Sequence, residues 1–413
     1  MTSNKAESYY FETKDGVPKL WTSGFIAFVC LNIFIFLGFD VLLPTLTLYL
    51  ESHGHSRDVI GRIFSFFMIA AIIMRMIAPR LVLLIKPFLL VRLGLCVGGL
   101  SVIGYFFAHS APAASAVRFL HGLGFGVAST VLTALAAQII PAHRMAQGMG
   151  FLGLGTILTL ALGPSAGIWL KDNLGYLPMF VVVSGIYLTG LVWTFKMPDL
   201  ALTPPPEGKR KPKLVLLSRL ALAPSLLMFM IGISISSVAI YLALYFNEVG
   251  LAYSGWYFGL STIGICFSRL FSGRIQDRFG HRFVITPAII LMSGAVMVIP
   301  RISGPLSLFV AALMWGLAAG SLFPSIQALS FSKIPAHGRT EVAASIFNAF
   351  DLGMGTGSVV FGLISEYFQT YKAAYWGNSV NLAFFLTFYL LYYFVISPKK
   401  SQSAPKTTKP AAT

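Results

Sequence analysis

Charged residues are scarce in this chain. Only 11% of its 413 residues are Asp, Glu, Lys or Arg, whereas 56% are hydrophobic. Soluble domains carry roughly 25% charged residues, so the composition excludes an ordinary soluble protein. It predicts instead a protein that crosses a membrane several times.

Cysteine is rarer still. Cys30, Cys96 and Cys266 lie in apolar runs with no short spacing between them. They support neither a disulfide framework nor a thiolate metal site, so we predict no metal site and no cofactor. A phosphate-binding glycine loop and a catalytic triad pattern are also missing from the sequence, and we therefore expect a protein that is not an enzyme.

Acidic residues are outnumbered by basic ones, 14 to 30, and the net charge is +16. With the N-terminus placed inside, nearly all loop cations fall on the same side of the membrane. The exceptions are Arg57, Lys171, Arg301 and Lys372. This positive-inside distribution predicts a multi-pass protein of the plasma (cell inner) membrane with both termini in the cytoplasm. It explains the basic charge without nucleic acid as a partner.

Twelve apolar segments have lengths near the roughly 20 residues that cross a bilayer. They span roughly 22–48, 58–78, 87–109, 113–140, 146–170, 177–197, 223–246, 254–273, 283–300, 305–331, 341–366 and 373–396. Residues 1–20 are polar and mixed in charge, and the first apolar run is too long for a signal-peptide core, so no cleaved leader is predicted.

A polar stretch in the middle separates two groups of six segments. It holds Pro204-Pro205-Pro206 and the basic run Lys209–Lys213, which is typical of a linker. The predicted organisation is a cytoplasmic tail (1–20), a six-helix bundle (21–197), a cytoplasmic linker (198–222), a second six-helix bundle (223–397) and a cytoplasmic tail (398–413).

The two groups repeat one another at an offset of 194 positions. In this register Arg75 matches Arg269, Gly122 matches Gly316, and Ile140-Pro141-Ala142-His143 matches Ile334-Pro335-Ala336-His337. The repeat predicts an all-α integral membrane fold of twelve transmembrane helices in two pseudo-symmetric bundles, with a transport path between them.

Three motifs resemble those of the major facilitator superfamily. Residues Gly273-Arg274-Ile275-Gln276-Asp277-Arg278-Phe279-Gly280-His281-Arg282 are similar to its signature loop, and Arg118-Phe119-Leu120-His121-Gly122 is similar to its fourth-helix motif. Residues Gly163-Pro164-Ser165-Ala166-Gly167 resemble its fifth-helix antiporter motif, although Thr159 and Ile168 stand where glycines are expected. The resemblance covers nearly the whole chain and implies the fold of that superfamily and secondary transport.

Asp40 is the first candidate site residue, because a charged side chain within a membrane helix is costly and usually functional. With Pro44 it resembles the first-helix acid of multidrug/proton antiporters, which works with the fourth-helix arginine, here Arg118. The pair is expected either to couple proton movement to transport or to pin two helices permanently. Arg118 could alternatively bind an anionic substrate.

Four further intramembrane residues carry open alternatives. His121 is a proton relay, a substrate contact or a structural histidine, and Asp351 is a second proton or substrate site or a latch for Arg269. Arg75 and Arg269 are interpreted as gating residues or scaffold, and the same holds for Gly273, Asp277, Arg278 and Arg282 of the signature motif.

Two aromatic residues, Phe36 and Tyr241, are candidates for lining a substrate cavity. Gly163, Pro164 and Gly167 are assigned to helix packing. No bound cofactor is predicted, and the expected partners are a small-molecule substrate, protons and the lipid bilayer, with the protein acting as a monomer.

The favoured function is proton-coupled export of a small amphiphilic or organic solute by alternating access. The alternatives are uptake of a sugar, amino acid or carboxylate, export of a metal-chelating, siderophore-like compound, and a membrane sensor or scaffold that does not transport.

Overall fold

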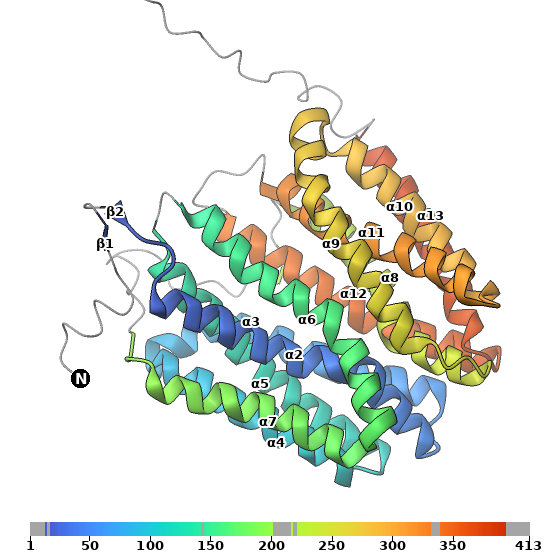
Figure 1. Cartoon of the computed structure of the whole chain (residues 1–413), viewed down its shortest axis with the longest axis horizontal. Helices are drawn as coiled ribbons and strands as arrows, with labels where there is room; N and C mark the ends of the chain where they lie inside the picture. Colours follow the sequence, from blue (N-terminus) through green and yellow to red (C-terminus); the bar gives the residue numbers. More distant parts are fainter. Residues whose placement is uncertain are drawn as a thin grey trace, which may run out of the picture.

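The computed structural model describes residues 13–14, 17–141, 144–200, 216–217, 221–331 and 339–393. Twelve long α-helices make up nearly all of this part of the chain (Figure 1). The first six are α2 (Ser23–Ser52), α3 (Arg57–Leu84), α4 (Pro87–Phe107), α5 (Ala111–Ile139), α6 (Met145–Leu174) and α7 (Tyr176–Lys196). The second six are α8 (Leu222–Glu248), α9 (Ser254–Phe279), α10 (Arg282–Val298), α11 (Pro305–Phe331), α12 (Arg339–Tyr367) and α13 (Lys372–Leu391).

Short elements complete the described structure. A two-residue pair of antiparallel strands, β1 (Thr13–Lys14) and β2 (Val17–Pro18), precedes α2, and a 3₁₀ turn, η3 (Ile299–Arg301), follows α10. Residues 1–12, 201–215, 218–220 and 394–413 lie outside the described residues, so the boundaries of the tails and the linker stay predictions.

The helix ends follow from local chemistry. The Thr22 hydroxyl accepts a hydrogen bond from the backbone N–H of Phe25 and caps α2, and Ser110 caps α5 in the same way. Gly280 ends α9 with a φ of +91°, a left-handed conformation that favours glycine.

The membrane assignment agrees with the apolar character of these helices. Within the described part of the chain, ten helices are long and apolar enough to cross a membrane. The other two, α9 and α13, carry polar side chains: Arg269, Arg274, Asp277 and Arg278 on α9, and Asn378 and Asn381 on α13. Both pack within the second bundle, α9 against α11 and α13 against α8 and α10. The predicted twelve-helix membrane fold is confirmed.

The internal repeat is visible in the packing. Gly122 of α5 lies against the Phe67 carbonyl of α3 so closely that a Cβ would overlap it. The repeat-related Gly316 of α11 lies against the Ser261 carbonyl of α9 in the same way. Because 67 and 261 also differ by 194, the offset found in the sequence relates contacts as well as residues.

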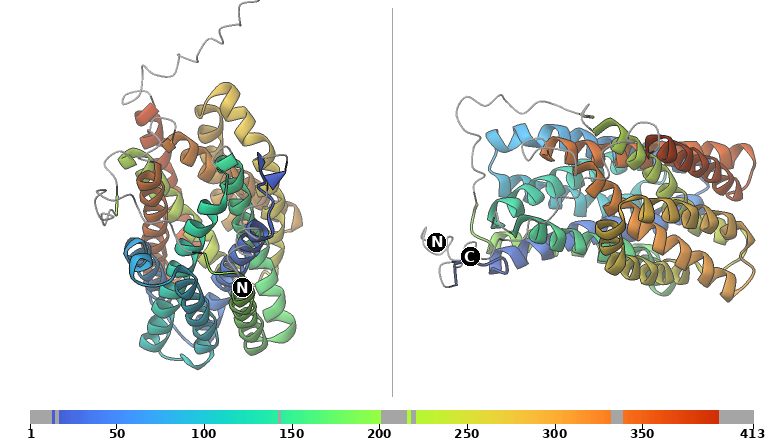
Figure 2. Two further views of the ribbon diagram at one scale, coloured as in Figure 1. Left: turned by 90° about the vertical axis from the view of Figure 1, so that its left-hand side faces the viewer. Right: turned by 90° about the horizontal axis from the view of Figure 1, so that it is seen from above.

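The two bundles meet along three helix pairs, α2 with α8, α3 with α12, and α6 with α9. We call the last two the α3·α12 seam and the α6·α9 seam. We call the end of the molecule where α7 stops and α8 starts the linker end, and the end where α2 turns into α3 the far end. Figures 1 and 2 show the bundles side by side, with α6 and α9 drawing apart toward the linker end.

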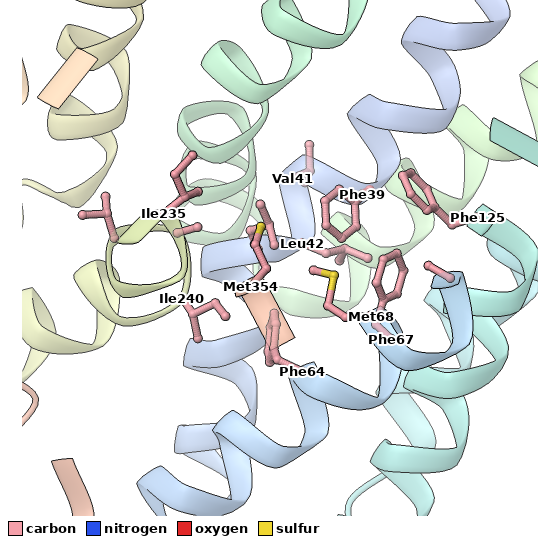
Figure 3. Close-up of a cluster of buried hydrophobic side chains, with 14 of the residues drawn as sticks. Phe39, Val41, Leu42, Phe64, Phe67, Met68, Phe125, Ile235, Ile240 and Met354 are labelled. Carbon is pink, nitrogen blue, oxygen red and sulfur yellow. The ribbon is translucent and has the colours of Figure 1, made fainter. Parts of the chain in front are cut away.

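Apolar side chains from both bundles fill the centre of the interface. Figure 3 shows Phe39, Phe64, Phe67, Met68 and Phe125 of the first bundle close to Ile235, Ile240 and Met354 of the second. All of these side chains are buried. Burial at roughly 25 cal/mol per Å² of apolar area stabilises the joined state.

Two predicted helix ends are wrong. The second and eighth helices were expected to end near residues 78 and 273, but α3 continues to Leu84 and α9 to Phe279. Most of the signature motif from Gly273 is therefore the last turns of α9, and the chain leaves the helix only at Gly280. Charged residues at a helix end had been read as loop, although a cationic side chain there can extend to the membrane surface.

Candidate functional site

Asp40 lies in the middle of α2 with only 2% of its surface exposed. Its backbone packs on α6 because Gly163 has no side chain, and a Cβ there would lie 2.7 Å from that of Asp40. The Thr159 side chain of α6 faces the carboxyl group, but the carboxylate atom Oδ2 has no hydrogen-bond partner. Pro44 lacks the N–H that would bond the Asp40 carbonyl in a regular helix. Asp40 is thus a buried acid whose hydrogen bonding is incomplete.

Arg118 of α5 is completely buried within the same bundle. Its guanidinium lies over the rings of Phe64 and Phe67, 4.3 and 4.5 Å from their centroids, where a cation is attracted to the π face. Nη1 donates to the Tyr105 hydroxyl at 3.4 Å. Nε and Nη2 have no hydrogen-bond partner, so this cation also retains unused donors.

Asp40 and Arg118 do not form the predicted ion pair in this conformation. The ion pairs of the described residues do not include one between them. Consecutive residues of a helix point about 100° apart. Phe39 therefore faces the Arg118 guanidinium, at 5.9 Å, while Asp40 faces α6.

His121 joins Arg118 to a third helix. Its Nδ1 hydrogen-bonds the Tyr105 hydroxyl at 3.1 Å and its Nε2 the Tyr187 hydroxyl of α7 at 3.0 Å. The Tyr187 ring packs directly on Gly38, two residues before Asp40. The chain Arg118–Tyr105–His121–Tyr187 therefore connects the buried cation to the part of α2 that carries Asp40.

The two tyrosines were not predicted as site residues. Tyrosines are common in membrane helices, and the sequence around Tyr105 and Tyr187 does not indicate that their hydroxyl groups bond a histidine on another helix. The available signal was Gly38, because a glycine in the middle of α2 leaves space for a large side chain, here the Tyr187 ring.

Asp351 forms an ion pair with Arg75 across the α3·α12 seam. The two side chains are 11% and 19% exposed, respectively. The interpretation of Asp351 as a latch for Arg269 is therefore wrong for this conformation, because its partner comes from the other bundle. The pair joins α3, which carries the predicted gating residue Arg75, to α12.

Arg269, the repeat mate of Arg75, forms no ion pair or hydrogen bond in the described part of the chain, and its buried Nε has no partner. The other signature residues turn to their own bundle. Gly273 borders open space, Arg278 lies over the Phe279 ring, and Arg282 donates to the Tyr393 hydroxyl at 3.2 Å. The Asp277 side chain lies outside the described residues.

The two aromatic candidates lie in different surroundings. The Phe36 ring contacts Phe125 at 5.2 Å within the first bundle. Tyr241 of α8 is fully buried, and its hydroxyl donates to the Ser358 carbonyl of α12. Its ring also borders Gly61 of α3, so the structure brings Tyr241 to the closed part of the bundle interface.

The glycine motif of α6 packs mainly within its own bundle. A Cβ on Gly167 would lie 2.5 Å from the Val41 carbonyl of α2, and Gly163 contacts Asp40 on the same helix. Gly163 and Gly167 therefore allow α6 to pack closely on α2 of the same bundle. Pro164, between them, is buried in α6.

A set of polar contacts closes the far end. The backbone N–H of Arg57 donates to Glu366 of α12 at 3.1 Å, and its guanidinium lies 3.9 Å from Glu248 of α8. Asn247 donates to Glu51 across the same gap at 3.2 Å. Sequence reasoning noted Arg57 only as an exception among the loop cations, because partners from three helices cannot be read from spacing.

Comparison with known proteins gives one family for the whole chain. The family model described as Major Facilitator Superfamily matches residues 28–357 and 253–413. The chain is 25% identical over 285 residues to the multi-drug resistance efflux pump PmrA of Streptococcus pneumoniae, covering 67% of this chain and 71% of the pump. It is 20% identical over 354 residues to the staphylopine export protein of Staphylococcus aureus, covering 78% of this chain and 85% of that protein.

Solved structures share the fold. The nucleoside transporter NupG superposes with a TM-score of 0.74 at 12% identity, covering 89% of this chain and 100% of that chain. A bacterial homolog of the human lysosomal transporter Spinster, in an inward-facing and occupied conformation, superposes with a TM-score of 0.70 at 12% identity, covering 89% and 95%. At such identities the likeness concerns the fold alone.

Proposed function

Because the chain belongs to the major facilitator superfamily, and so is a membrane transporter and not an enzyme, we propose that it exports a small amphiphilic organic solute in exchange for protons. It works as a monomer in the plasma membrane, with the linker end in the cytoplasm. The relatives named as exporters support the direction, and the positive-inside distribution supports the orientation.

The contacts between the bundles support alternating access with the far end closed. At the far end, Arg57 and Glu366 join the bundles, and the Ser165 hydroxyl of α6 donates to the Gly255 carbonyl of α9 at 3.1 Å. Toward the linker end α6 and α9 separate (Figure 1). Rocking of one bundle against the other would exchange the closed and the open end.

The observation that carries proton coupling is the unpartnered carboxylate oxygen of Asp40. A charged carboxylate at such depth costs on the order of 3 kcal/mol, and among the described residues no cation lies within ion-pair distance of this one. In the proposed cycle Asp40 gives its proton to the cytoplasm and takes one from outside. Each proton moved inward supplies about 2.3 kcal/mol per 100 mV of membrane potential.

Arg118 acts on Asp40 through the tyrosine–histidine chain in this proposal. The chain ends where Tyr187 packs on Gly38 of α2, so a change in its hydrogen bonding alters the packing next to Asp40. Asp351 and Arg75 form the gate between the bundles, because their ion pair must break when the α3·α12 seam opens.

The test uses inside-out vesicles energised with a proton gradient and the fluorescent amphiphile 8-anilinonaphthalene-1-sulfonate as probe. Asp40→Asn keeps the size and removes the titratable group, so we expect gradient-driven accumulation to fall at least tenfold while binding of the probe remains. Asp172→Asn, which removes a carboxylate that is 54% exposed at the far end, should transport like the unaltered protein. Full gradient-dependent transport by Asp40→Asn would overturn the coupling role.

Export of a metal-chelating, siderophore-like compound is a narrower version of the same function. One relative is named as a staphylopine exporter, and the interior of this chain holds cationic donors without partners on Arg118 and Arg269. Competition of the purified chelator against the probe, in its free and metal-loaded forms, would test it.

A further inference from the structure

Arg269 is a cation at membrane depth. It lies ten residues before Phe279, the last residue of α9, which is about 15 Å along a helix with a rise of 1.5 Å per residue. Arg274 and Arg278 in the last turns of α9 reach the membrane surface, so Arg269 lies about one to two helical turns inside that surface. An arginine at this depth normally pairs with an acid or with backbone carbonyls.

The face of α9 that carries Arg269 turns toward α6. On α3, Gly61, Met68 and Arg75 all contact α12, at Ser358, Gly355 and Asp351. The repeat mates of Gly61 and Ser65 are Gly255 and Gly259, and these contact Ile168 and Ser165 of α6. The same register puts Arg269 on the α6-facing side of α9, as Arg75 is on the α12-facing side of α3.

The acid that would neutralise Arg269 is missing from the repeat. The partner of Arg75 is Asp351, and 194 positions before it the chain has Ile157, an uncharged residue. Among the described residues Arg269 thus has no counter-ion, whereas its repeat mate Arg75 has one. Its Nε is buried and has no hydrogen-bond partner.

We propose that Arg269 docks the anionic group of the transported solute, so that the protein selects organic anions (carboxylates, sulfonates or phosphates) over neutral analogues of the same shape. The proposal rests on the proposed transport function. The guanidinium presents a planar fork of donors that matches the two oxygens of such a group. Toward the linker end α6 and α9 draw apart (Figure 1), and in this proposal a solute that enters from that side supplies the charge that position 157 lacks.

The test compares two fluorescent probes that share one aromatic scaffold but differ in charge. 8-Anilinonaphthalene-1-sulfonate is anionic and N-phenyl-1-naphthylamine is neutral, and both report binding by fluorescence. Binding to the full chain is measured in phosphatidylcholine nanodiscs with empty discs subtracted. The unaltered protein should bind the sulfonate at least tenfold more tightly than the amine. Arg269→Gln should remove this preference and leave the affinity for the amine within twofold.

Three further variants separate charge from structure. Arg269→Lys keeps a cation and should keep most of the preference for the sulfonate. Ile157→Asp restores the missing acid and should abolish the preference with Arg269 still present. Arg301→Gln removes an exposed cation at the far end of the second bundle and should change neither affinity.

The possible outcomes are distinct. No preference of the unaltered protein for the sulfonate, or a preference that survives both Arg269→Gln and Ile157→Asp, overturns the proposal. The same comparison is repeated in discs that contain phosphatidylglycerol. If the unaltered protein and Arg269→Gln then bind the sulfonate equally well, the anion at Arg269 is a lipid headgroup, and the proposal is overturned. Loss of proton-driven transport by Asp40→Asn is a separate result, so either proposal can fail while the other stands.

Discussion

The two seams between the bundles occupy equivalent places in the repeat but are built differently. In the α3·α12 seam a Cβ on Gly61 would overlap the Ser358 carbonyl, and Arg75 pairs with Asp351. In the α6·α9 seam a Cβ on the mate Gly255 would lie 3.4 Å from the Ile168 side chain, and Arg269 forms no ion pair with any residue that the structure describes. One seam is close-packed and neutralised, whereas the other is looser and carries an unmatched charge.

Contacts inside the bundles have not diverged in this way. Gly122 and Gly316 touch the equivalent carbonyls of Phe67 and Ser261. Close backbone packing within a bundle is needed in every state of a rocking transporter, because the bundle moves as one body. A seam must separate in one state, so its residues can differ between the two copies. The repeat therefore preserves close packing within the bundles, whereas the two seams differ in packing and in charge.

The largest expected effect is a difference in stability between a variant of Arg75 and the same variant of its repeat mate, Arg269. Arg75→Gln leaves Asp351 mostly buried without its cation, which should reduce the free energy of unfolding by about 3 kcal/mol. Arg269→Gln removes a cation that has no partner, so its stability should not fall. Chemical unfolding in mixed micelles measures both, and the double variant Arg75→Gln/Asp351→Asn should recover most of the loss. Equal destabilisation by the two single variants would break the comparison.

An intermediate effect is expected for the paired glycines of the seams. Gly61→Ala should disfavour the closed far end by about 2 kcal/mol, because the added methyl group overlaps a backbone carbonyl. That free energy changes the ratio of closed to open molecules by roughly thirtyfold. Gly255→Ala meets only ordinary van der Waals contact and serves as the matched control.

Distances between spin labels at Ser52→Cys and Val249→Cys, in a background without the native cysteines, report this ratio. A far end that stays closed in Gly61→Ala, or that opens equally in Gly255→Ala, would show that the packing of the seam does not set the equilibrium.

The smallest effect concerns the polar closure of the far end. The side chains of Arg57 and Glu248 are about one quarter exposed. Arg57→Gln should therefore destabilise the closed state, relative to the open one, by no more than about 1 kcal/mol. The same spin labels should show a larger effect at low salt than at high salt, because exposed pairs are screened. Lys372→Gln removes a far-end cation that has no ion pair among the described residues and should have no effect. A salt-independent shift would contradict the ion-pair explanation.

Sequence reasoning could select candidates where a single residue carries the signal, and their functional roles stay predictions. Asp40, Arg118 and Asp351 stand out because a charge in an apolar helix is costly, and all three are buried in the structure. It failed where the partner mattered: Arg118 faces Phe64 and Tyr105 and not Asp40. Partners depend on helix rotation, and a difference of 100° between neighbouring residues is enough to exchange an acid for an aromatic ring.

The sequence by itself determined the membrane class, the twelve helices, the duplication and the residues on which function was to be sought. These follow from the length of apolar runs and from one offset along the chain, which are properties of the chain alone. Only the tertiary structure decided which of the duplicated arginines has a counter-ion, because Arg75 and Asp351 are 276 positions apart and meet through the packing of two bundles. The same packing gives Arg269 no acidic partner among the described residues, a difference that the repeat in the sequence does not reveal.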